Sequence, residues 1–211
     1  MIRLYDIDFY FVTDSKFSKN GIFSDVENAL KAGCKIVQYR EKKKDTKTMI
    51  NESRRIKRIC NNKAFFLVND RVDVALASNA DGVHIGQEDI PYEFARKLLG
   101  KNRIIGLTVH NLDEAIQAEK LGVDYIGVGP IFETDTKEDI QKPCGVEMIN
   151  IIRKEVNIPI VAVGGINKNN LKEILDAGAD FIVSINPVVS SDDVYSEVVN
   201  FIKIIKEGKL K

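Results

Sequence analysis

The sequence lacks a net charge, because 31 Lys and Arg residues balance 31 Asp and Glu residues. A nucleic-acid-binding protein usually carries a basic excess gathered on one face, so the balance predicts no nucleic-acid partner. Intrinsic disorder requires low hydrophobicity together with high net charge, whereas 44% of these residues are hydrophobic. The composition therefore favours a folded protein with a substantial core.

Long apolar runs and cysteine patterns are also missing. No run approaches the roughly 18 residues of a membrane span, and no charged-then-apolar leader opens the sequence. Cys34, Cys60 and Cys144 are widely spaced and odd in number, so they form neither a disulfide framework nor a CxxC pair. We expect a cytoplasmic protein without a membrane partner. The 211 residues, with no linker or composition shift, predict one domain over 1–211.

Eight short apolar segments recur along the chain, rich in β-branched and aromatic residues and with little polar alternation. Such segments are typical of parallel strands buried on both faces. We expect strands over 9–13, 35–39, 64–68, 82–85, 103–107, 124–128, 159–163 and 180–184. Patterns with the 3.6-residue period of a helix lie between them, for example over 112–116 and 171–175.

Eight alternating units predict an α/β fold, a single-domain (β/α)8 TIM barrel. A doubly wound open sheet is the alternative, but no GxGxxG motif follows the first strand. Gly33, Gly122 and Gly178 each follow a helical pattern and precede a strand, where a left-handed residue is favoured. In this barrel the active site lies at the C-terminal ends of the strands, so the residues just after each apolar segment become the candidates.

Charged side chains follow the second, third and fourth expected strands. Strand alternation places Gln38, Arg40 and Lys42 on one side, and two cations suit an anion such as phosphate. Asp70 and Asp89 follow the next two strands, and carboxylates that converge there suit Mg²⁺, which keeps positions for substrate phosphates and water. The alternatives are a solvated charged loop, a helix cap at Asp70 and an ordinary loop acid at Asp89.

Two later segments also suit phosphate. The long loop over 133–145 carries Thr134, Thr136 and Lys137, and it is either a lid over the site or a plain surface loop. Gly164 and Gly165 are expected to open the next helix, where backbone N–H groups and the helix N-terminus attract an anion. One Mg²⁺ site with two phosphate-binding regions suits a reaction between two phosphorylated small molecules.

The two histidines, His84 and His110, have no His or Cys partner at zinc spacing, so a zinc site is not expected. No Ser–His–Asp or Cys–His arrangement is discernible, so the sequence offers no candidate for covalent catalysis. His84 is expected to be a hydrogen-bonded barrel residue.

Taken together, the strand-end motifs resemble the thiamine-phosphate synthase (thiamine-phosphate pyrophosphorylase) family. They are QxREK at 38–42, NDR at 69–71, GVHIGQxD at 82–89, GxGPIF at 127–132, TxTK at 134–137 and GGI at 164–166. The resemblance implies a transferase of thiamine biosynthesis. It would join 4-amino-5-hydroxymethyl-2-methylpyrimidine pyrophosphate to 4-methyl-5-(2-phosphoethyl)thiazole and release pyrophosphate. A Mg²⁺-assisted dissociative route is implied as well.

The resemblance also implies roles for individual residues. Asp70 and Asp89 would hold Mg²⁺ on the pyrophosphate. The catalytic residues would be Arg40, Lys42, Thr108 and Lys137. The substrate-binding residues would be Gln38, Arg40, Lys42, Asn69, His84, Thr108, Thr134, Thr136, Lys137, Gly165, Ser184 and Asn186. Among them, Gln38 and His84 would lie beside the pyrimidine, with Thr108 near the pyrimidine and its leaving group.

The sequence departs from the family pattern at two positions. The family usually has serine where Thr108 stands, and the hydroxyl survives. At the eighth strand the family's serine aligns with Asn186, followed by Pro187, which has no backbone N–H to donate to a phosphate. Either Asn186 would serve as the donor, or Ser184 would do so after a local shift, or phosphate binding at this position is altered.

Three other functions remain as alternatives. They are a thiazole tautomerase-like barrel, a sugar-phosphate isomerase or lyase, and a non-catalytic thiamine-phosphate binder. The Asp70 and Asp89 pair and the TxTK loop favour the synthase. A homo-oligomer formed through the helices of the barrel is compatible with the sequence.

Overall fold

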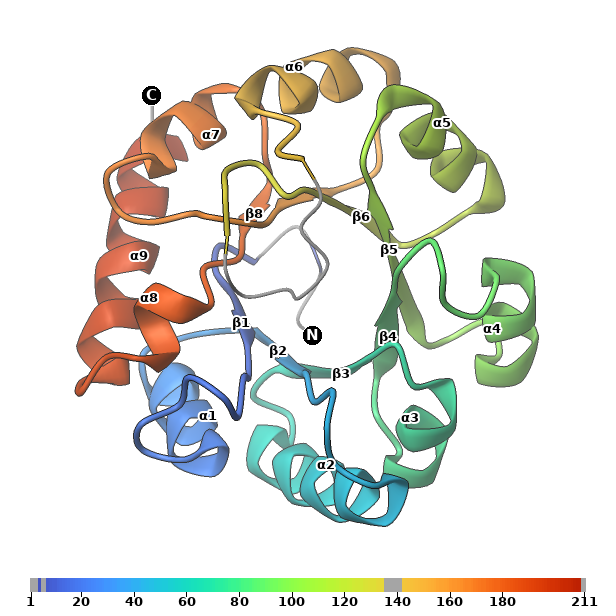
Figure 1. Ribbon diagram of the computed structural model, residues 1–211, viewed down its shortest axis with the longest axis vertical. Helices are drawn as coiled ribbons and strands as arrows, with labels where there is room; N and C mark the ends of the chain where they lie inside the picture. The colour runs from blue at the N-terminus through green and yellow to red at the C-terminus, as the bar shows by residue number, and fades with distance from the viewer. Residues whose placement is uncertain (1–3, 5–6, 135–141, 210–211) are drawn as a thin grey trace.

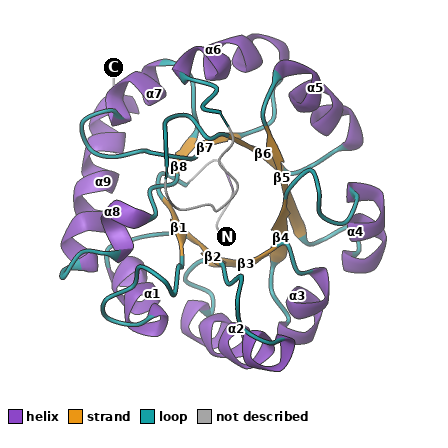
Figure 2. Cartoon of the chain, in the orientation of Figure 1, coloured by secondary structure: helices purple, strands orange, loops and turns teal. Residues whose placement is uncertain are grey.

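The computed structural model describes residues 4, 7–134 and 142–209. Eight parallel strands pair in sequence order, and an isolated bridge between Phe9 and Ile182 joins the last strand to the first. Helices surround these strands as an outer ring (Figures 1 and 2). The structure is therefore a TIM barrel, as the sequence predicts.

The elements alternate around the barrel. The strands are β1 (Tyr10–Val12), β2 (Ile36–Tyr39), β3 (Phe65–Asn69), β4 (Gly82–Ile85), β5 (Ile104–Val109), β6 (Tyr125–Val128), β7 (Ile160–Ala162) and β8 (Phe181–Ile182). The helices of the described residues are α1 (Ile22–Lys31), α2 (Thr46–Cys60), α3 (Val72–Ser78), α4 (Tyr92–Leu99), α5 (Leu112–Leu121), α6 (Val146–Glu155), α7 (Leu171–Asp176), α8 (Asn186–Val189) and α9 (Val194–Lys209).

Each expected strand overlaps an observed one, although β3 and β5 end later than expected and β8 is shorter. Strand β5 continues to Val109, so Thr108 lies within the strand and pairs in register with Gly127 of β6. Strand β8 covers only Phe181 and Ile182, and the short helix α8 follows it. The end of the barrel near β8 is therefore built mainly from loop and helix backbone.

Two apolar clusters explain why the strands lack polar alternation. The larger cluster fills the layer between strands and helices, with residues such as Phe11, Val37 and Ile126. The smaller one fills the barrel interior and includes Tyr10 and Tyr125, which are buried. Because both faces of each strand are covered, nearly every strand position is apolar.

A repeated aspartate supports the N-terminal end of the barrel. Directly before β4, β6 and β8, one carboxylate accepts a backbone N–H from the preceding strand and pairs with a basic residue of a helix. The three sets are Asp81 with Phe66 and Lys57, Asp124 with Ile105 and Arg96, and Asp180 with Ile160 and Arg153. Each aspartate thus ties two strands and a helix together.

Replacing Asp124 by alanine should lower the free energy of unfolding by about 1–3 kcal/mol, because the buried Ile105 N–H and the Arg96 guanidinium lose their acceptor. Urea titration measures the loss. Asp192→Ala is the control, because Asp192 is exposed and its ion pair with Lys19 contributes little. Equal losses in the two variants would contradict this account of Asp124. Turnover should be unchanged, since Asp124 lies at the end of the barrel opposite the strand C-termini.

Candidate active site

Arg40 and Lys42, which follow β2, are each held by a carboxylate. The Arg40 guanidinium donates to Asp14 Oδ2 at 2.6 Å, and both side chains are largely buried. The Arg40 backbone N–H donates to Thr13 Oγ1 at 3.0 Å, which ties the end of β2 to the end of β1. Arg40 is therefore held by two contacts from the same loop. Sequence reasoning missed Asp14, although a Thr-Asp pair directly after the first strand was visible.

Lys42, Asp70 and Asp89 lie together across the ends of β2, β3 and β4. The Lys42 ammonium donates to Asp70 Oδ2 at 2.5 Å, and Asp70 is also within hydrogen-bonding reach of the Asp89 carboxyl. Burial raises the pKa of Asp70, the Asp89 carboxyl adds to the rise, and Lys42 opposes it. Two carboxylates this close repel each other when both are ionised, and a cation between them would relieve that repulsion.

Local backbone geometry fixes both carboxylates. Asp70 has a left-handed backbone with φ of 61°, which aspartate tolerates better than most residues, and its N–H donates to the His84 carbonyl at 2.8 Å. The Asp89 carboxylate accepts the Gly86 N–H at 2.6 Å, closing a short turn after β4. The two acids therefore reach their places through separate, rigid turns.

The donor set fits a magnesium ion. Mg²⁺ is bound by one or two protein carboxylates and completes its shell with water and substrate phosphates. In the described part of the chain, no third Asp, Glu, His or Cys joins the pair formed by Asp70 and Asp89. The oxygen-only pair beside Lys42 is thus suited to a hard cation shared with an anionic substrate.

A chain of hydrogen bonds crosses the barrel interior just below these charges. Gln38 Nε2 donates to the Tyr10 hydroxyl at 2.7 Å, and that hydroxyl lies 2.9 Å from the Tyr125 hydroxyl. The Tyr125 hydroxyl lies 2.9 Å from His84 Nδ1, and His84 Nε2 lies 2.9 Å from Thr108 Oγ1. Three residues predicted to bind the pyrimidine are therefore connected by two buried tyrosines that sequence reasoning left in the core.

Two glycines make room for this chain. A Cβ at Gly106 would lie 2.0 Å from Tyr125 Cζ, and a Cβ at Gly127 would lie 2.9 Å from His84 Cε1. The rings of Tyr125 and His84 are stacked, with centroids 5.4 Å apart. Any side chain larger than hydrogen at Gly106 or Gly127 would collide with one of these rings.

The glycine pair after β7 differs from the expectation. Helix α7 begins at Leu171, so Gly164 and Gly165 do not open it, and that prediction was wrong. A Cβ at Gly165 would lie 2.6 Å from Phe132 Cβ, and Gly165 has φ of 65°. The glycine pair lets the backbone after β6 pass closely over the backbone after β7. A turn over Asn167–Asn170 separates the two glycines from helix α7.

The residues at the end of β8 have separate structural tasks. Ser184 is buried, and its hydroxyl donates to the Ile166 carbonyl at 2.6 Å, so that proton is used within the fold. Asn186 begins α8, and Pro187 lies in the first turn, where a missing N–H removes no helical hydrogen bond.

Four predicted residues remain, one at the end of β3 and three in the segment of the sequence after β6. Asn69 ends β3 in register with His84. Thr134 lies at the edge of the described part of the loop after β6. Thr136 and Lys137 lie outside the described residues. His110, which had no assigned role, donates from Nδ1 to the Gly129 carbonyl at 2.7 Å.

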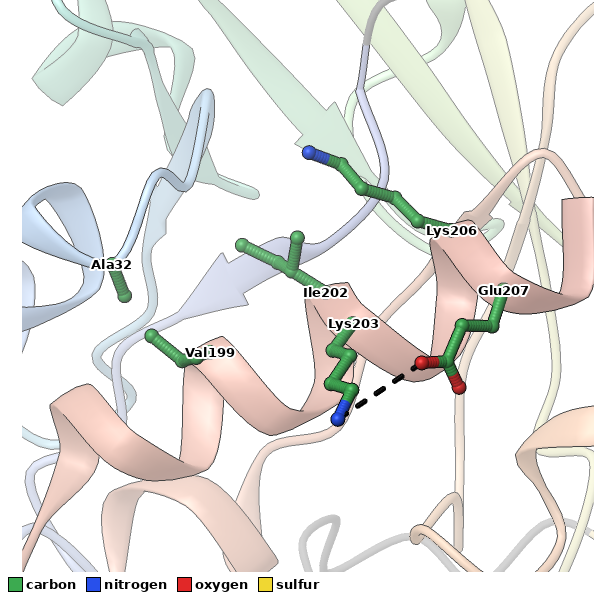
Figure 3. Close-up of a pocket in the computed structure, with 6 residues that line it drawn as sticks. All are labelled: Ala32, Val199, Ile202, Lys203, Lys206 and Glu207. Carbon is green, nitrogen blue, oxygen red and sulfur yellow. Dashed lines mark ion pairs between the residues drawn. The ribbon is translucent and has the colours of Figure 1, made fainter. Parts of the chain in front are cut away.

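A groove on the outer ring of helices is unrelated to these residues. Its volume is about 410 Å³, and it lies between the end of α1 and the surface of α9 (Figure 3). Its lining residues are Ala32, Val199, Ile202, Lys203, Lys206 and Glu207. None of them is a predicted site residue, so the strand ends remain the candidate active site.

Comparison with known proteins shows the family to which this chain belongs. A family model described as thiamine monophosphate synthase matches residues 9–188. A thiamine-phosphate synthase from Methanosarcina mazei is 58% identical over 206 residues, covering 98% of this chain and 86% of the relative. Another, from Chloroflexus aurantiacus, is 47% identical and covers 91% of this chain and 89% of the relative. The chain belongs to the thiamine-phosphate synthase family.

The solved structures agree with this family. Thiamine phosphate pyrophosphorylase from Pyrococcus furiosus is 38% identical with a TM-score of 0.88, covering 97% of this chain and 98% of that chain. A geranylgeranylglyceryl phosphate synthase from Thermoplasma acidophilum, with 14% identity and a TM-score of 0.70, shares the fold alone. The chain therefore has thiamine-phosphate synthase activity, a transferase reaction of thiamine biosynthesis that acts on thiamine precursors. In the part of the chain that the structure describes, no helix has the length and apolar character to cross a bilayer.

Proposed function

We propose that the strand-end site joins the pyrimidine pyrophosphate to the thiazole phosphate by a dissociative substitution. The bond between the pyrimidine methylene carbon and the pyrophosphate oxygen breaks, and both electrons leave with the pyrophosphate. The aminopyrimidine ring stabilises the methylene cation, and the lone pair of the thiazole nitrogen forms the new carbon–nitrogen bond. No general base is required, because that nitrogen carries no proton.

The single observation that carries this proposal is the contact of Lys42, Asp70 and Asp89 across three strand ends. A dissociative reaction places growing negative charge on the leaving group, so fixed cations that meet that charge lower the barrier. Arg40 and Lys42 are proposed to contact the pyrophosphate, with Asn69 and Lys137 beside them. The partners Asp14 and Asp70 hold the two cations in place.

Asp70 and Asp89 are proposed to hold Mg²⁺. When bound, the ion would neutralise part of the charge that develops on the departing pyrophosphate. The pKa of Asp70, raised by burial and by Asp89, supports this role, because a cation would remove the repulsion between the two carboxylates. Lys42, half exposed, is able to turn from Asp70 to a phosphate oxygen.

The remaining predicted residues divide between the two substrates. Gln38, His84 and Thr108 are proposed to line the pyrimidine, which agrees with their common hydrogen-bond chain. The thiazole phosphate is proposed to lie toward the later strands. Its proposed contacts are Thr134, Thr136, Gly165, Ser184 and Asn186. Because the Ser184 proton is engaged with Ile166, Asn186 is the better donor of the two residues after β8.

Mixing the purified protein with both phosphorylated substrates and Mg²⁺ should give thiamine phosphate, detected by its fluorescent oxidation product. A chelator in excess over the metal should abolish product formation, and added Mg²⁺ should restore it. Product formation unaffected by the chelator would remove the metal from the proposal. Product from either substrate alone would contradict the joining reaction.

We also propose that the enzyme acts in the cytoplasm. Cys34, Cys60 and Cys144 are free thiols, and Cys34 and Cys60 are buried. Free thiols persist in a reducing compartment, which supports this location. Fractionation of cells that contain the protein, with the product assay as readout, tests it; activity confined to another compartment would contradict it.

A further inference from the structure

We propose that Tyr10 and Tyr125 are positioning residues whose hydroxyl groups set the direction of one hydrogen-bond chain from Gln38 to Thr108. The chain would present the Gln38 carbonyl as an acceptor and the Thr108 hydroxyl as a donor to the pyrimidine. The proposal rests on the proposed function for the identity of that ligand. The direction of the chain itself follows from chemistry within the barrel.

The direction begins at Gln38. An amide nitrogen donates hydrogen bonds and cannot accept them, so the contact between Gln38 Nε2 and the Tyr10 hydroxyl runs toward Tyr10. Tyr10 has one hydroxyl proton, and the Tyr125 hydroxyl 2.9 Å away is its acceptor. Gln38 is thereby held with its nitrogen toward Tyr10 and its carbonyl oxygen available on the other side.

The direction continues through the histidine. The Tyr125 hydroxyl, having accepted from Tyr10, donates its proton to His84 Nδ1 at 2.9 Å. That requires His84 to carry its ring proton on Nε2, which then donates to Thr108 Oγ1 at 2.9 Å. Thr108 accepts within the chain and so keeps its own hydroxyl proton to donate to a ligand.

Burial makes this chain rigid. Tyr10 and Tyr125 are both inaccessible to water, and burial raises the pKa of each phenol, so both keep their protons at neutral pH. The His84 ring is stacked on Tyr125, and Gly106 and Gly127 leave space for the two rings. At the two tyrosine hydroxyls, which solvent does not reach, no water can replace a missing partner.

The hydrogen-bond chain couples the orientation of the Gln38 amide to the donor or acceptor role of the Thr108 hydroxyl. Each intermediate group has one proton to give, so turning the Gln38 amide would reverse every bond and leave Thr108 as a donor to His84. An aminopyrimidine carries an amine donor and ring-nitrogen acceptors, which match an acceptor at Gln38 and a donor at Thr108. A 4-oxo analogue exchanges the donor for an acceptor, and the fixed chain would reject it.

The test measures the His84 tautomer directly. The protein has only two histidines, so nitrogen-15 NMR of the ring nitrogens resolves both, and His110→Asn assigns them. In the wild-type protein without substrates, we expect the His84 proton on Nε2. In Tyr10→Phe, which removes one hydroxyl, we expect a mixture of tautomers. The value of kcat/KM for the pyrimidine pyrophosphate should fall about 10-fold, and KM for the thiazole phosphate should be unchanged.

Tyr39→Phe is the matched control. Tyr39 is also a buried tyrosine on a strand, but its hydroxyl donates to Glu52 at 2.6 Å, on the α2 side of the barrel wall. This variant should leave the His84 tautomer and the kinetic constants unchanged. Thermal unfolding of both variants separates loss of stability from loss of the chain.

Several results would overturn the proposal. One is a wild-type His84 with its proton on Nδ1, which remains decisive even if Tyr10→Phe does not fold. Another is a Tyr10→Phe variant that loses activity while the tautomer stays on Nε2, because that loss would be one of packing. A wild-type protein with the expected tautomer but no product would contradict the proposed function and leave the direction of the chain standing.

Discussion

Asp89→Asn should lower kcat/KM by about 100- to 1,000-fold while leaving the fold intact. The amide keeps an oxygen that can accept the Gly86 N–H, so the turn after β4 survives. The substitution removes one of the two charges that would hold the metal against the pyrophosphate. It also removes the neighbour that helps to raise the pKa of Asp70, so the free energy of unfolding should stay equal or rise slightly.

The assay is a Mg²⁺ titration of product formation, with urea unfolding measured in parallel. Asp73→Asn is the control, because Asp73 is an exposed acid at the start of α3 that pairs with Arg71. That variant should remain within about twofold of wild type, the range of a small surface effect. Full activity in Asp89→Asn at low Mg²⁺ would exclude Asp89 as a metal ligand.

Gly106→Ala should lower the free energy of unfolding by about 1–3 kcal/mol. The new methyl group would lie 2.0 Å from Tyr125 Cζ and 2.4 Å from the Tyr125 hydroxyl oxygen, and the Tyr125 side chain is fully buried. The ring must move, and its hydrogen bonds to Tyr10 and His84 would be lost with the packing. Activity should therefore fall together with stability.

A double-mutant cycle tests this cause. In a Tyr125→Ala background, the added methyl group has space, so the cost of Gly106→Ala should largely disappear. Gly208→Ala is the control within helix α9, where the new Cβ meets the tip of the Leu175 side chain and alanine is the better helix former. A cost at Gly106 that persists without the Tyr125 ring would contradict the steric explanation.

The fold was predictable because the same sequence pattern of strand, helix and glycine repeats along the chain. Apolar segments without polar alternation and glycines at helix ends recur in unit after unit, and Gly33, Gly122 and Gly178 all have positive φ as expected. The prediction that failed concerned a single connection after β7. Gly164 and Gly165 are followed by a turn rather than a helix, since Asn167 and Asn170 close that turn with their own side chains.

The site was predictable to the level of neighbouring strands. Residues directly after consecutive parallel strands must meet at one edge, which is why Lys42, Asp70 and Asp89 come together as charge and position suggest. The roles of Tyr10 and Tyr125 were not predictable, because a tyrosine in an apolar strand has the same pattern as any core aromatic residue.

The sequence by itself determined the barrel, the end of the barrel that carries the chemistry, and the residue types that meet there. Periodicity and strand order contain that information, because each unit is read locally. Only the tertiary structure decided which hydroxyl faces which ring nitrogen and which carboxylate holds which cation. Tyr10 and Tyr125 are 115 residues apart, and their contact depends on closure of the barrel and on the missing side chain of Gly106.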